Sequence, residues 1–548
     1  MSYKDEYKKW LELADENTKA ELAKIKDEGE IRERFYRNLE FGTGGLRGII
    51  GAGTNRINNH VVARASYGLA QYIKKQTKNI ALEKVVIAYD SRNFSKEFAM
   101  TAAKVISSNG IKTFIFDELR PTPELSFAVR HLGATAGIVV TASHNPAKYN
   151  GYKIYWSDGG QIPPDIAEKI LSEINAVDYF EFNTEGNDKL IEIIGEEVDK
   201  AYIESVYAQS INKDVKKDKF KLVYTPLHGS GNKLVRRILK TSGFNDVLIV
   251  KEQELPDGDF PTVASPNPEN KECFSYAIEL AKKNDVDLII GTDPDCDRMG
   301  IVVKNKDGEY VPMTGNQVGV MIMDYILQHS SDVKNGAVVT TIVSTRMAKT
   351  VADYYNVKLF ETLTGFKFIG EKIYEFEQSS DYTFLFGFEE SYGLLAGTYC
   401  RDKDAVIASM LIAEMAAFYA EKGMTLYDVM NSLYEKFGGF YEELVSITLE
   451  GEAGLEKIKS IMKNLRENPF DELGGVKVKA VTDYLGETDL PKSDVLRFEF
   501  DNGLTIVIRP SGTEPKIKIY YLCEGESFES AKQKTQDMKR IAENSIFS

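Results

Sequence analysis

Four short segments, far apart in the chain, combine residue types that can bind ions or transfer groups. The first is TASHNPAKYNGYK, residues 141–153, which follows an apolar run typical of a buried strand. Ser143 is therefore expected at the carboxyl end of that strand, where open α/β sheets place their ligands. Its hydroxyl could accept a phosphoryl group, and His144 and Lys153 are neighbouring candidates for proton transfer. The alternative is an ordinary Asn/Pro/Gly turn in which the serine caps a backbone group.

The second segment, GTDPDCDRMG at residues 291–300, contains three aspartates, Asp293, Asp295 and Asp297. Alternate side chains of an extended chain share one face, so this spacing predicts that the three carboxylates converge. Three like charges repel one another unless a cation compensates them, and Mg²⁺ is the natural partner for oxygen ligands. The segment lacks the length and the final glutamate of a calcium-binding EF-hand loop. A solvated acidic turn is the alternative, although Arg298 and the flanking glycines favour a built site.

The third segment is FGFEESYG at residues 386–393, in which Glu389 and Ser391 are two positions apart at the end of a predicted strand. Such a pair could bind neighbouring hydroxyls of a sugar. The alternative is a helix N-terminus, where acidic residues are favourable.

The fourth segment is RPSGTEPK at residues 509–516, between two predicted strands. Arg509 could form a two-pronged contact with a phosphate. Ser511, Gly512 and Thr513 could add hydroxyls and backbone N–H groups around the same anion. A plain hairpin turn is the alternative.

Further basic residues stand in glycine-rich or polar stretches. Because the net charge is −15, an anionic ligand needs positive groups gathered locally at its site. Candidates are Arg47 within the glycine-rich run of residues 41–58, Lys367 beside Thr364 and Gly365 in TGFK, and Lys403 in RDK. A flexible linker and solvated lysines are the alternatives.

The elements that must position these residues alternate between helix and strand. The first ~40 residues form a helical pattern, and residues 42–53 form a glycine-rich loop. Helices are then predicted at 61–78 and 96–108 and strands at 85–90, 112–117 and 136–143. The same rhythm restarts at Lys219 and at Ala337, which predicts three α/β units with mostly parallel sheets.

The last ~100 residues follow a different pattern, because strands dominate there. Alternating runs occupy residues 477–485, 495–503, 504–512 and 516–525, and a helix follows from about residue 527. Asn502-Gly503 between two of these runs is a strong hairpin signal. This part is predicted to be an antiparallel sheet with helices on one side, an α+β domain.

Composition limits the classes of protein to which the chain can belong. With 548 residues, 43% of them apolar, and a mean hydropathy of −0.29, an ordinary globular protein of several domains is expected. The start MSYKDEYKKW has no apolar core of a signal peptide, and no apolar run reaches membrane-spanning length. The acidic balance argues against a nucleic-acid partner. Four widely spaced cysteines without a CxxC pair predict reduced thiols and a cytoplasmic location.

At TASHNP, the DxDxD-R loop, the GxEES-like loop and RxSGTxP, the chain resembles the α-D-phosphohexomutase family over nearly its full length. FGTGGLRG and TGFKFIG are most similar to the branch that contains bacterial phosphoglucomutases. The resemblance implies three similar α/β domains with mixed sheets and a smaller C-terminal α+β domain, arranged around a central cleft. The expected boundaries are 1–210 for the phosphoserine domain, 211–312 for the metal-binding domain, 313–438 for the sugar-recognition domain and 439–548 for the phosphate-binding domain.

The resemblance also implies a role for each motif residue. Ser143 matches the phosphoserine and, with the three aspartates, would complete a site for one Mg²⁺. Lys153 matches a proton-transfer lysine and Arg47 its partner. Glu389 and Ser391 match the sugar-hydroxyl ligands, and the Arg509 loop matches the phosphate clamp. Some members have a histidine shortly after the sugar loop, but Tyr392-Gly393-Leu394 has none, so the second proton-transfer group stays open.

The activity implied is exchange of glucose 1-phosphate and glucose 6-phosphate, with glucose 1,6-bisphosphate as intermediate and activator. Phosphomannomutase and phosphopentomutase are alternatives within the family. A sugar phosphatase and a non-catalytic sugar-phosphate sensor are rivals outside it. The expected partner is a small sugar phosphate, with no nucleic acid and no membrane, and the expected assembly is a monomer or a weak dimer.

Overall fold

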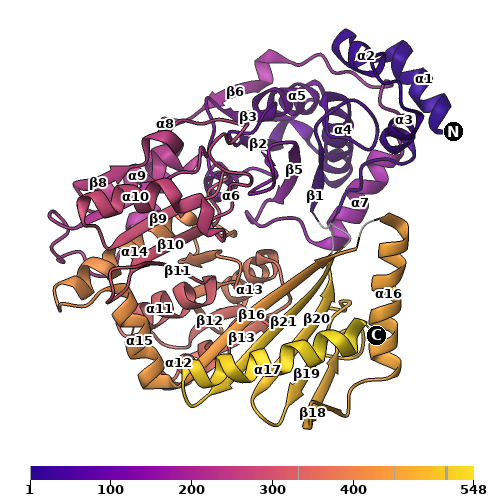
Figure 1. Ribbon diagram of the computed structural model, residues 1–548. Helices are drawn as coiled ribbons and strands as arrows, with labels where there is room; N and C mark the ends of the chain where they lie inside the picture. The colour runs from indigo at the N-terminus through magenta and orange to yellow at the C-terminus, as the bar shows by residue number, and fades with distance from the viewer. Residues whose placement is uncertain (1, 43, 331–332, 450, 512–515, 548) are drawn as a thin grey trace. The chain divides into compact units, whose positions relative to one another are not determined.

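The computed structural model describes residues 2–42, 44–330, 333–449, 451–511 and 516–547. This part of the chain divides into two compact units. The first unit comprises Met1–Val302, Tyr310–Pro312 and Gly397–Phe418; the second comprises Val303–Glu309, Met313–Ala396 and Tyr419–Ser548. The described strands form four sheets, which can be followed in Figure 1.

The first sheet has the strand order β1-β5-β4-β2-β3-β6. Its strands are β1 (Gly45–Ile49), β2 (Lys84–Tyr89), β3 (Lys112–Phe116), β4 (Ala136–Val140), β5 (Tyr149–Trp156) and β6 (Ile191–Ile194). β2 is parallel to β3 and β4, and β3 is parallel to β6, whereas β5 runs antiparallel to both β4 and β1. The central strands are apolar and buried because helices cover them, as in other α/β sheets.

Two helices of this part, α4 (Asn59–Gln76) and α5 (Ser95–Ser108), lie close to the predicted positions 61–78 and 96–108. The others are α6 (Thr122–His131) and α7 (Pro164–Asn175), with a 3₁₀ turn at Ile80–Leu82. α4 packs against α5 and α7, while α5 and α6 both contact β2 and β4. α6 therefore lies next to the strand that precedes Ser143.

Two predictions for this sheet were wrong. Residues predicted as a loop form β1, and residues 149–153 of the serine segment belong to β5, so the sheet is mixed. The glycines of these two segments allow neighbouring strands to approach closely; they do not mark a flexible loop. A Cβ on Gly151 would lie 2.4 Å from the carbonyl oxygen of Thr141 and 2.8 Å from that of Leu46.

Three N-terminal helices share the hydrophobic core of the first sheet, and Trp10 is the largest side chain that they bury there. They are α1 (Tyr3–Leu13), α2 (Glu16–Leu22) and α3 (Glu28–Phe35), and each begins after a capping Ser or Asp. Trp10 is fully buried, with ring centroids 5.7 Å from Phe35, 5.2 Å from His60 and 5.2 Å from Tyr179. Such edge-to-face contacts add to the area that Trp10 buries.

The second sheet has the order β11-β10-β9-β7-β8, in which β7 is parallel to β8 and β9. Its strands are β7 (Lys221–Thr225), β8 (Asp246–Ile249), β9 (Leu288–Thr292), β10 (Met299–Lys304) and β11 (Tyr310–Met313). The helices in this region are α8 (Glu196–Tyr207), α9 (Gly231–Thr241) and α10 (Ser275–Asn284), with 3₁₀ turns at Asp188–Leu190, Lys251–Gln253 and Lys271–Phe274. The aspartate loop connects β9 to β10.

The third sheet has the order β13-β12-β14-β15, and only its β14–β15 pairing is antiparallel. Its strands are β12 (Gly336–Thr341), β13 (Lys358–Thr362), β14 (Thr383–Phe388) and β15 (Leu394–Ala396). The helices of this stretch are α11 (Gly315–Leu327), α12 (Met347–Tyr354), α13 (Phe366–Ser379), α14 (Ala405–Ala420) and α15 (Leu426–Phe437). Glu389 and Ser391 follow β14, as predicted from the sequence.

The fourth sheet is antiparallel in the order β16-β21-β20-β19-β18-β17. Its strands are β16 (Gly439–Thr448), β17 (Glu472–Leu473), β18 (Val476–Asp483), β19 (Leu496–Phe500), β20 (Leu504–Pro510) and β21 (Lys516–Gly525), with α16 (Gly451–Glu467) and α17 (Phe528–Phe547). Asn502-Gly503 turns β19 into β20, and Gly503 has the positive φ of 88° that the turn requires. The three mixed sheets and this antiparallel sheet confirm the predicted fold class.

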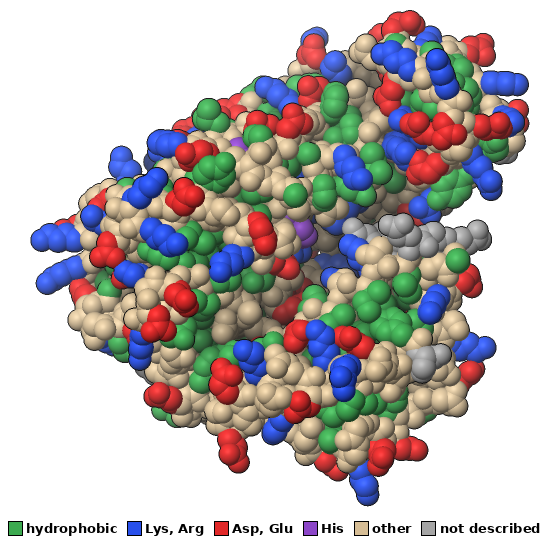
Figure 2. Space-filling view, in the orientation of Figure 1, with side chains coloured by type: hydrophobic (Ala, Val, Ile, Leu, Met, Phe, Trp, Pro, Cys, Tyr) green, Lys and Arg blue, Asp and Glu red, His purple; other side chains and the backbone are tan. Residues whose placement is uncertain are grey.

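Surface charge is mixed where it can be seen. On the face shown in Figure 2, Lys and Arg side chains are interspersed with Asp and Glu side chains. Because the described residues on the face in Figure 2 form no broad basic surface, positive charge for an anionic ligand must come from individual Lys and Arg residues at the binding site. Among the described residues, no helix is both long and apolar enough to cross a membrane.

The burial of Trp10 leads to a stability prediction. Trp10→Ala should cost about 3–5 kcal/mol, because it removes a large buried side chain and leaves a cavity. We expect a lower midpoint for the first urea transition, followed by the fluorescence of Trp156, the other tryptophan. Leu13→Ala, at a residue that is 51% exposed on the same helix, is the control and should leave the midpoint unchanged. Equal midpoints for both variants would contradict the packing role of Trp10.

Candidate active site

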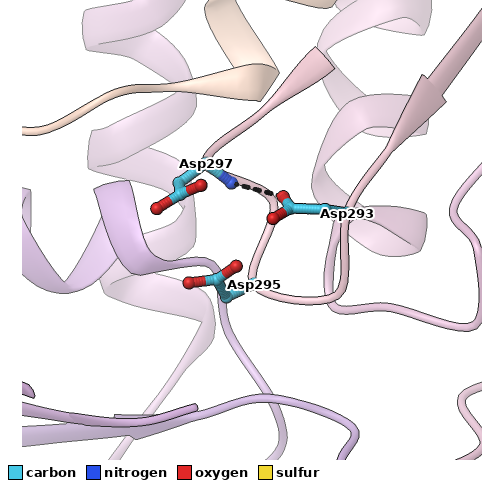
Figure 3. Close-up of side chains that lie close together, drawn as sticks. All are labelled: Asp293, Asp295 and Asp297. Carbon is cyan, nitrogen blue, oxygen red and sulfur yellow. Dashed lines mark hydrogen bonds between the residues drawn. The ribbon is translucent and has the colours of Figure 1, made fainter. Parts of the chain in front are cut away.

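The loop between β9 and β10 brings the three predicted aspartates together. Ligand oxygens of Asp293, Asp295 and Asp297 all lie within 4.8 Å of one another, and the three residues are buried. The prediction of convergence is confirmed, but the reason differs: the loop is a tight turn with Cys296 at φ 53°, not an extended segment. The backbone N–H of Asp297 donates to Asp293 Oδ1 at 3.1 Å (Figure 3). The N–H of Arg298 donates to the same oxygen at 3.0 Å.

The electrostatics of this triad favour a cation. Burial and the adjacent carboxylates of Asp295 and Asp297 raise the pKa of Asp293 well above its ordinary value. Burial also disfavours charge on Asp295, but the Lys153 ammonium outweighs this effect and lowers the pKa of Asp295. Within the described part of the chain, Asp295 Oδ1 and Asp297 Oδ1 are buried without a hydrogen-bond partner. Buried bare carboxylate oxygens are costly and fit the oxygen ligands of Mg²⁺.

Ser143 lies directly against this triad. Its Oγ donates to Asp293 Oδ2 at 2.9 Å and is 3.2 Å from Nδ1 of His144. The serine has a left-handed backbone with φ 52°, which is rare for a residue with a side chain. A hydroxyl in this place can transfer a group next to a bound metal ion.

Two residues at the carboxyl end of β2 hold the serine loop in that conformation. Asp90 accepts a hydrogen bond from the Thr141 hydroxyl at 2.6 Å, and that hydroxyl accepts from the Ser143 N–H at 2.8 Å. The buried guanidinium of Arg92 donates to the carbonyls of Ser143, Asn145, Pro146 and Tyr149. Arg92 thus satisfies four backbone acceptors of a single loop.

Two lysines bring positive charge to the triad. Lys153 Nζ lies 2.9 Å from Asp295 Oδ2 and 3.6 Å from Asp297 Oδ2. Burial opposes the charge of Lys153, but the two carboxylates outweigh burial and raise its pKa. Lys403 Nζ lies 3.2 Å from Asp297 Oδ2 and donates to Asp402 Oδ1 at 2.9 Å. Both predicted lysines therefore belong to the serine and aspartate site.

The pairing of β1 with β5 places Arg47 near the same site. Arg47 pairs with Gly151, and Gly45 pairs with Lys153, so Arg47 and Lys153 lie on the same face of the sheet. Burial, with the Arg298 and Arg47 guanidiniums, holds the pKa of His144 well below its ordinary value. The predicted arginine and histidine thus lie close enough to influence each other electrostatically.

Arg298 is oriented by acidic neighbours. Its Nη1 is 2.9 Å from Glu269 Oε1, and its Nε is 3.8 Å from Asp297 Oδ1. The Arg298 guanidinium is therefore engaged by carboxylates of the first unit.

The second unit gathers the other predicted residues. Glu389 Oε1 accepts the N–H of Gly365 at 2.8 Å, and Arg509 Nη1 donates to the hydroxyl of Thr364. The loop after β13, the loop after β14 and the end of β20 therefore meet. Ser511 donates its N–H to the Lys516 carbonyl at 2.7 Å. Gly512 and Thr513 lie outside the described residues.

The remaining predicted residues of the second unit are near these loops in sequence. Lys367 is in the first turn of α13, where burial lowers its pKa. Ser391 follows Glu389 by two positions in the turn between β14 and β15, and Tyr392 in this turn has φ 67°.

Several positioning residues were missed by the sequence analysis. Asp90 and Arg92 follow β2 at the same carboxyl edge as Ser143, so the edge rule applied to Ser143 could have found them. Asp402 accepts from Lys403 and, at 2.6 Å, from the Tyr155 hydroxyl. Burial and the adjacent Glu389 carboxylate raise the pKa of Glu390 to about 7. No sequence pattern indicated Asp402 or Glu390.

Comparisons with known proteins match four successive domains along the chain. Models of the four phosphoglucomutase/phosphomannomutase domains match in order: the α/β/α domains I, II and III at residues 38–181, 200–308 and 314–437, and the C-terminal domain at residues 450–541. A phosphoglucomutase of Staphylococcus aureus strain MRSA252 is 39% identical over 545 residues, or 96% of this chain and 97% of that protein. The phosphoglucomutase of strain MW2 is 38% identical with the same coverage.

Solved structures show the same fold. A phosphoglucomutase/phosphomannomutase family protein from Burkholderia thailandensis superposes with a TM-score of 0.68 at 20% identity, over 92% of this chain and 97% of that one. Parafusin from Paramecium gives a TM-score of 0.73 at 19% identity, over 94% and 96% of the chains.

The Arg92 contacts generate a prediction about the serine loop. Arg92→Lys keeps the charge but cannot satisfy four carbonyls, so roughly two hydrogen bonds of about 1 kcal/mol each are lost. We expect amide hydrogen exchange in residues 143–149 to accelerate by about tenfold or more, as measured by mass spectrometry. Arg64→Lys is the matched control, because buried Arg64 donates to the Val177 carbonyl, outside this loop. Unchanged exchange in Arg92→Lys would show that the guanidinium does not hold the loop.

Proposed function

The chain belongs to the phosphoglucomutase/phosphomannomutase family, and on this premise we propose that it interconverts glucose 1-phosphate and glucose 6-phosphate through a phosphorylated Ser143. The observation that carries the proposal is the Ser143 hydroxyl, 2.9 Å from one carboxylate of a buried aspartate triad. Relatives that are 38–39% identical and named phosphoglucomutase support glucose over mannose or a pentose as the sugar.

Asp293, Asp295 and Asp297 would hold one Mg²⁺, together with an oxygen of the phosphorylated serine. When bound, the ion neutralises charge on the transferring phosphoryl group, since phosphoryl transfer depends mainly on positioning and electrostatics. The two bare oxygens of Asp295 and Asp297 support this assignment. So does the donor set, which consists of oxygen atoms alone.

In the proposed first half-reaction, the bond between Ser143 Oγ and phosphorus breaks, and a bond from phosphorus to the free hydroxyl of the sugar monophosphate forms. Lys153 and His144 are the proposed proton-transfer groups for that hydroxyl, with Arg47 as a neighbouring cation. The product is glucose 1,6-bisphosphate. Transfer of its other phosphate back to Ser143 completes the exchange and restores the phosphorylated enzyme.

The second half-reaction requires recognition of the sugar in both orientations. We assign the non-reacting phosphate to Arg509, Ser511, Gly512 and Thr513, and the sugar hydroxyls to Glu389 and Ser391. Thr364, Gly365, Lys367, Arg298 and Lys403 are proposed further contacts with substrate. The hydrogen bonds that tie Gly365 to Glu389 and Thr364 to Arg509 support a single recognition surface in the second unit.

The proposal extends to the state of the protein in the cell. The four described cysteines are unpaired and buried, which fits a reducing compartment and supports a cytoplasmic location. We propose a monomer or weak dimer that acts on small sugar phosphates.

The rival activity is hydrolysis, because a serine beside a metal triad also suits a phosphatase. A hydrolase does not need a second phosphate site, and the Arg509 loop therefore favours the mutase.

The decisive experiment measures both products from glucose 1-phosphate, with Mg²⁺ and a trace of glucose 1,6-bisphosphate. We expect glucose 6-phosphate to form far faster than inorganic phosphate. Ser143→Ala should abolish isomer formation and the phosphate adduct in the intact mass, because no other oxygen takes the place of Oγ. Ser409→Ala, which removes a buried hydroxyl bonded within α14, is the control and should retain activity.

Two outcomes would contradict the proposal. Retained turnover in Ser143→Ala would exclude the phosphoserine, and phosphate release without isomer would favour the phosphatase. Faster turnover of mannose 1-phosphate or ribose 1-phosphate than of glucose 1-phosphate would reassign the sugar while leaving the mechanism in place.

Substitution of the clamp arginine tests the second phosphate site. Arg509→Lys retains the positive charge but loses the planar fork, so a charge-assisted hydrogen bond of about 1.5–3 kcal/mol is weakened. We expect kcat/KM for glucose 1-phosphate to fall by roughly 10- to 100-fold in steady-state assays. Exposed Arg540→Lys on α17 is the control for the substitution type. An unchanged kcat/KM in Arg509→Lys would remove Arg509 from the phosphate site.

A further inference from the structure

We propose that Thr122 is a positioning residue for the metal, because it occupies one oxygen of Asp295 and leaves the other free to bind the ion. This inference rests on the metal site of the proposed function but not on the identity of the sugar. Thr122 is the first residue of α6 and is 173 positions from Asp295 in sequence. Its hydroxyl donates to Asp295 Oδ2 at 3.0 Å, and its N–H donates to the Asp295 carbonyl at 2.9 Å.

The two oxygens of the Asp295 carboxylate have different surroundings. Oδ2 accepts from the Thr122 hydroxyl at 3.0 Å and from Lys153 Nζ at 2.9 Å. Oδ1 is equally buried but has no hydrogen-bond partner among the described residues. A partial rotation about the Cβ–Cγ bond would carry Oδ2 away from the Thr122 hydroxyl, so this hydrogen bond holds the carboxylate in one plane. Thr122 therefore fixes the orientation in which the second oxygen, Oδ1, is left without a protein donor among the described residues, for a metal ion to use.

A neutral donor is better suited to this task than the lysine. Lys153 also contacts Oδ2, but its charge lowers the negative potential that attracts a divalent cation. The Thr122 hydroxyl fixes the carboxylate without reducing its charge. Outer groups that orient a ligand in this way commonly change metal affinity by about 10- to 100-fold when removed.

The turn that carries Thr122 is rigid before any ion binds. Pro121 and Pro123 flank Thr122, and proline restricts the backbone to few conformations. Arg120, whose side chain is 1% exposed, anchors the turn through Asp199, with distances of 2.7 and 3.1 Å to its two oxygens. Both Thr122 and Asp295 are fully buried, so water does not compete for their hydrogen bond.

The test measures metal affinity rather than turnover. The full-length protein, stripped of metal with a chelator, is titrated with Mn²⁺, and free Mn²⁺ is followed by electron paramagnetic resonance. Thr122→Val keeps the shape and the backbone N–H but removes the hydroxyl, and we expect Kd to rise by about tenfold or more. Thr122→Ser keeps the hydroxyl and should bind Mn²⁺ nearly as the unmodified chain does.

Thr113→Val is the matched control. Thr113 is fully buried in the same unit, and its hydroxyl donates to the Ile111 carbonyl at 3.2 Å on β3, away from the aspartate loop. The Thr113→Val variant should bind Mn²⁺ with the same affinity as the unmodified chain. Thr122→Ala compared with Thr122→Ser gives the same contrast between variants that both lack the methyl group, should the valine variant fold poorly.

Three results would overturn the proposal. These are equal Mn²⁺ affinity in Thr122→Val and the unmodified chain, equal weakening in Thr122→Val and Thr113→Val, and equal affinity of Thr122→Ala and Thr122→Ser. The Mn²⁺ titration contains no sugar phosphate, so it does not depend on turnover. Failure of the mutase proposal would therefore show in product assays, and failure of the Thr122 proposal would show in the titration.

Discussion

The mutual repulsion of three buried carboxylates is the constraint on which the first unit depends. Asp293, Asp295 and Asp297 converge within 4.8 Å in a place that water does not reach, and such a cluster is unfavourable unless each charge is compensated. The fold compensates them from several elements. Backbone N–H groups of the loop reach Asp293, and ammonium groups of Lys153 and Lys403 reach the other two. The compensation is incomplete, because Asp295 Oδ1 and Asp297 Oδ1 have no hydrogen-bond partner among the described residues.

The same constraint explains why Ser143 needs so much support. A serine that must face the triad takes a left-handed backbone, which costs energy for a residue with a Cβ. Arg92 and Asp90 offset this cost from the end of β2, because they satisfy the carbonyls and, through Thr141, the N–H group of the loop. The strained serine loop is therefore stabilised by Arg92 and Asp90, two residues that take no part in the proposed phosphoryl transfer.

Much of this arrangement could be predicted from the sequence, because its signals are local. Strand and helix periods located the elements, the carboxyl-edge rule located Ser143, and the spacing of the three aspartates predicted that they converge. Prediction failed where a residue's position depends on distant partners. Nothing near residues 45–49 or 149–153 indicated two antiparallel strands, since their pairing depends on the close approach permitted by Gly151. Asp402 and Thr122 were missed for a similar reason: each acts through a contact with a residue more than a hundred positions away.

The distribution of charge separates the two halves of the proposed chemistry. In the first unit, Lys153 and Lys403 are paired with carboxylates, so the site has both signs at short range and suits a transferring phosphoryl group with its metal. In the second unit, Arg509 donates to the hydroxyl of Thr364, and its charge partly offsets the rise in the pKa of the buried Glu390 carboxyl. A guanidinium can form charge-assisted hydrogen bonds with a phosphate, which suits the proposed binding of the phosphate that does not react. An acidic chain can bind an anionic sugar in this way without a broad basic surface.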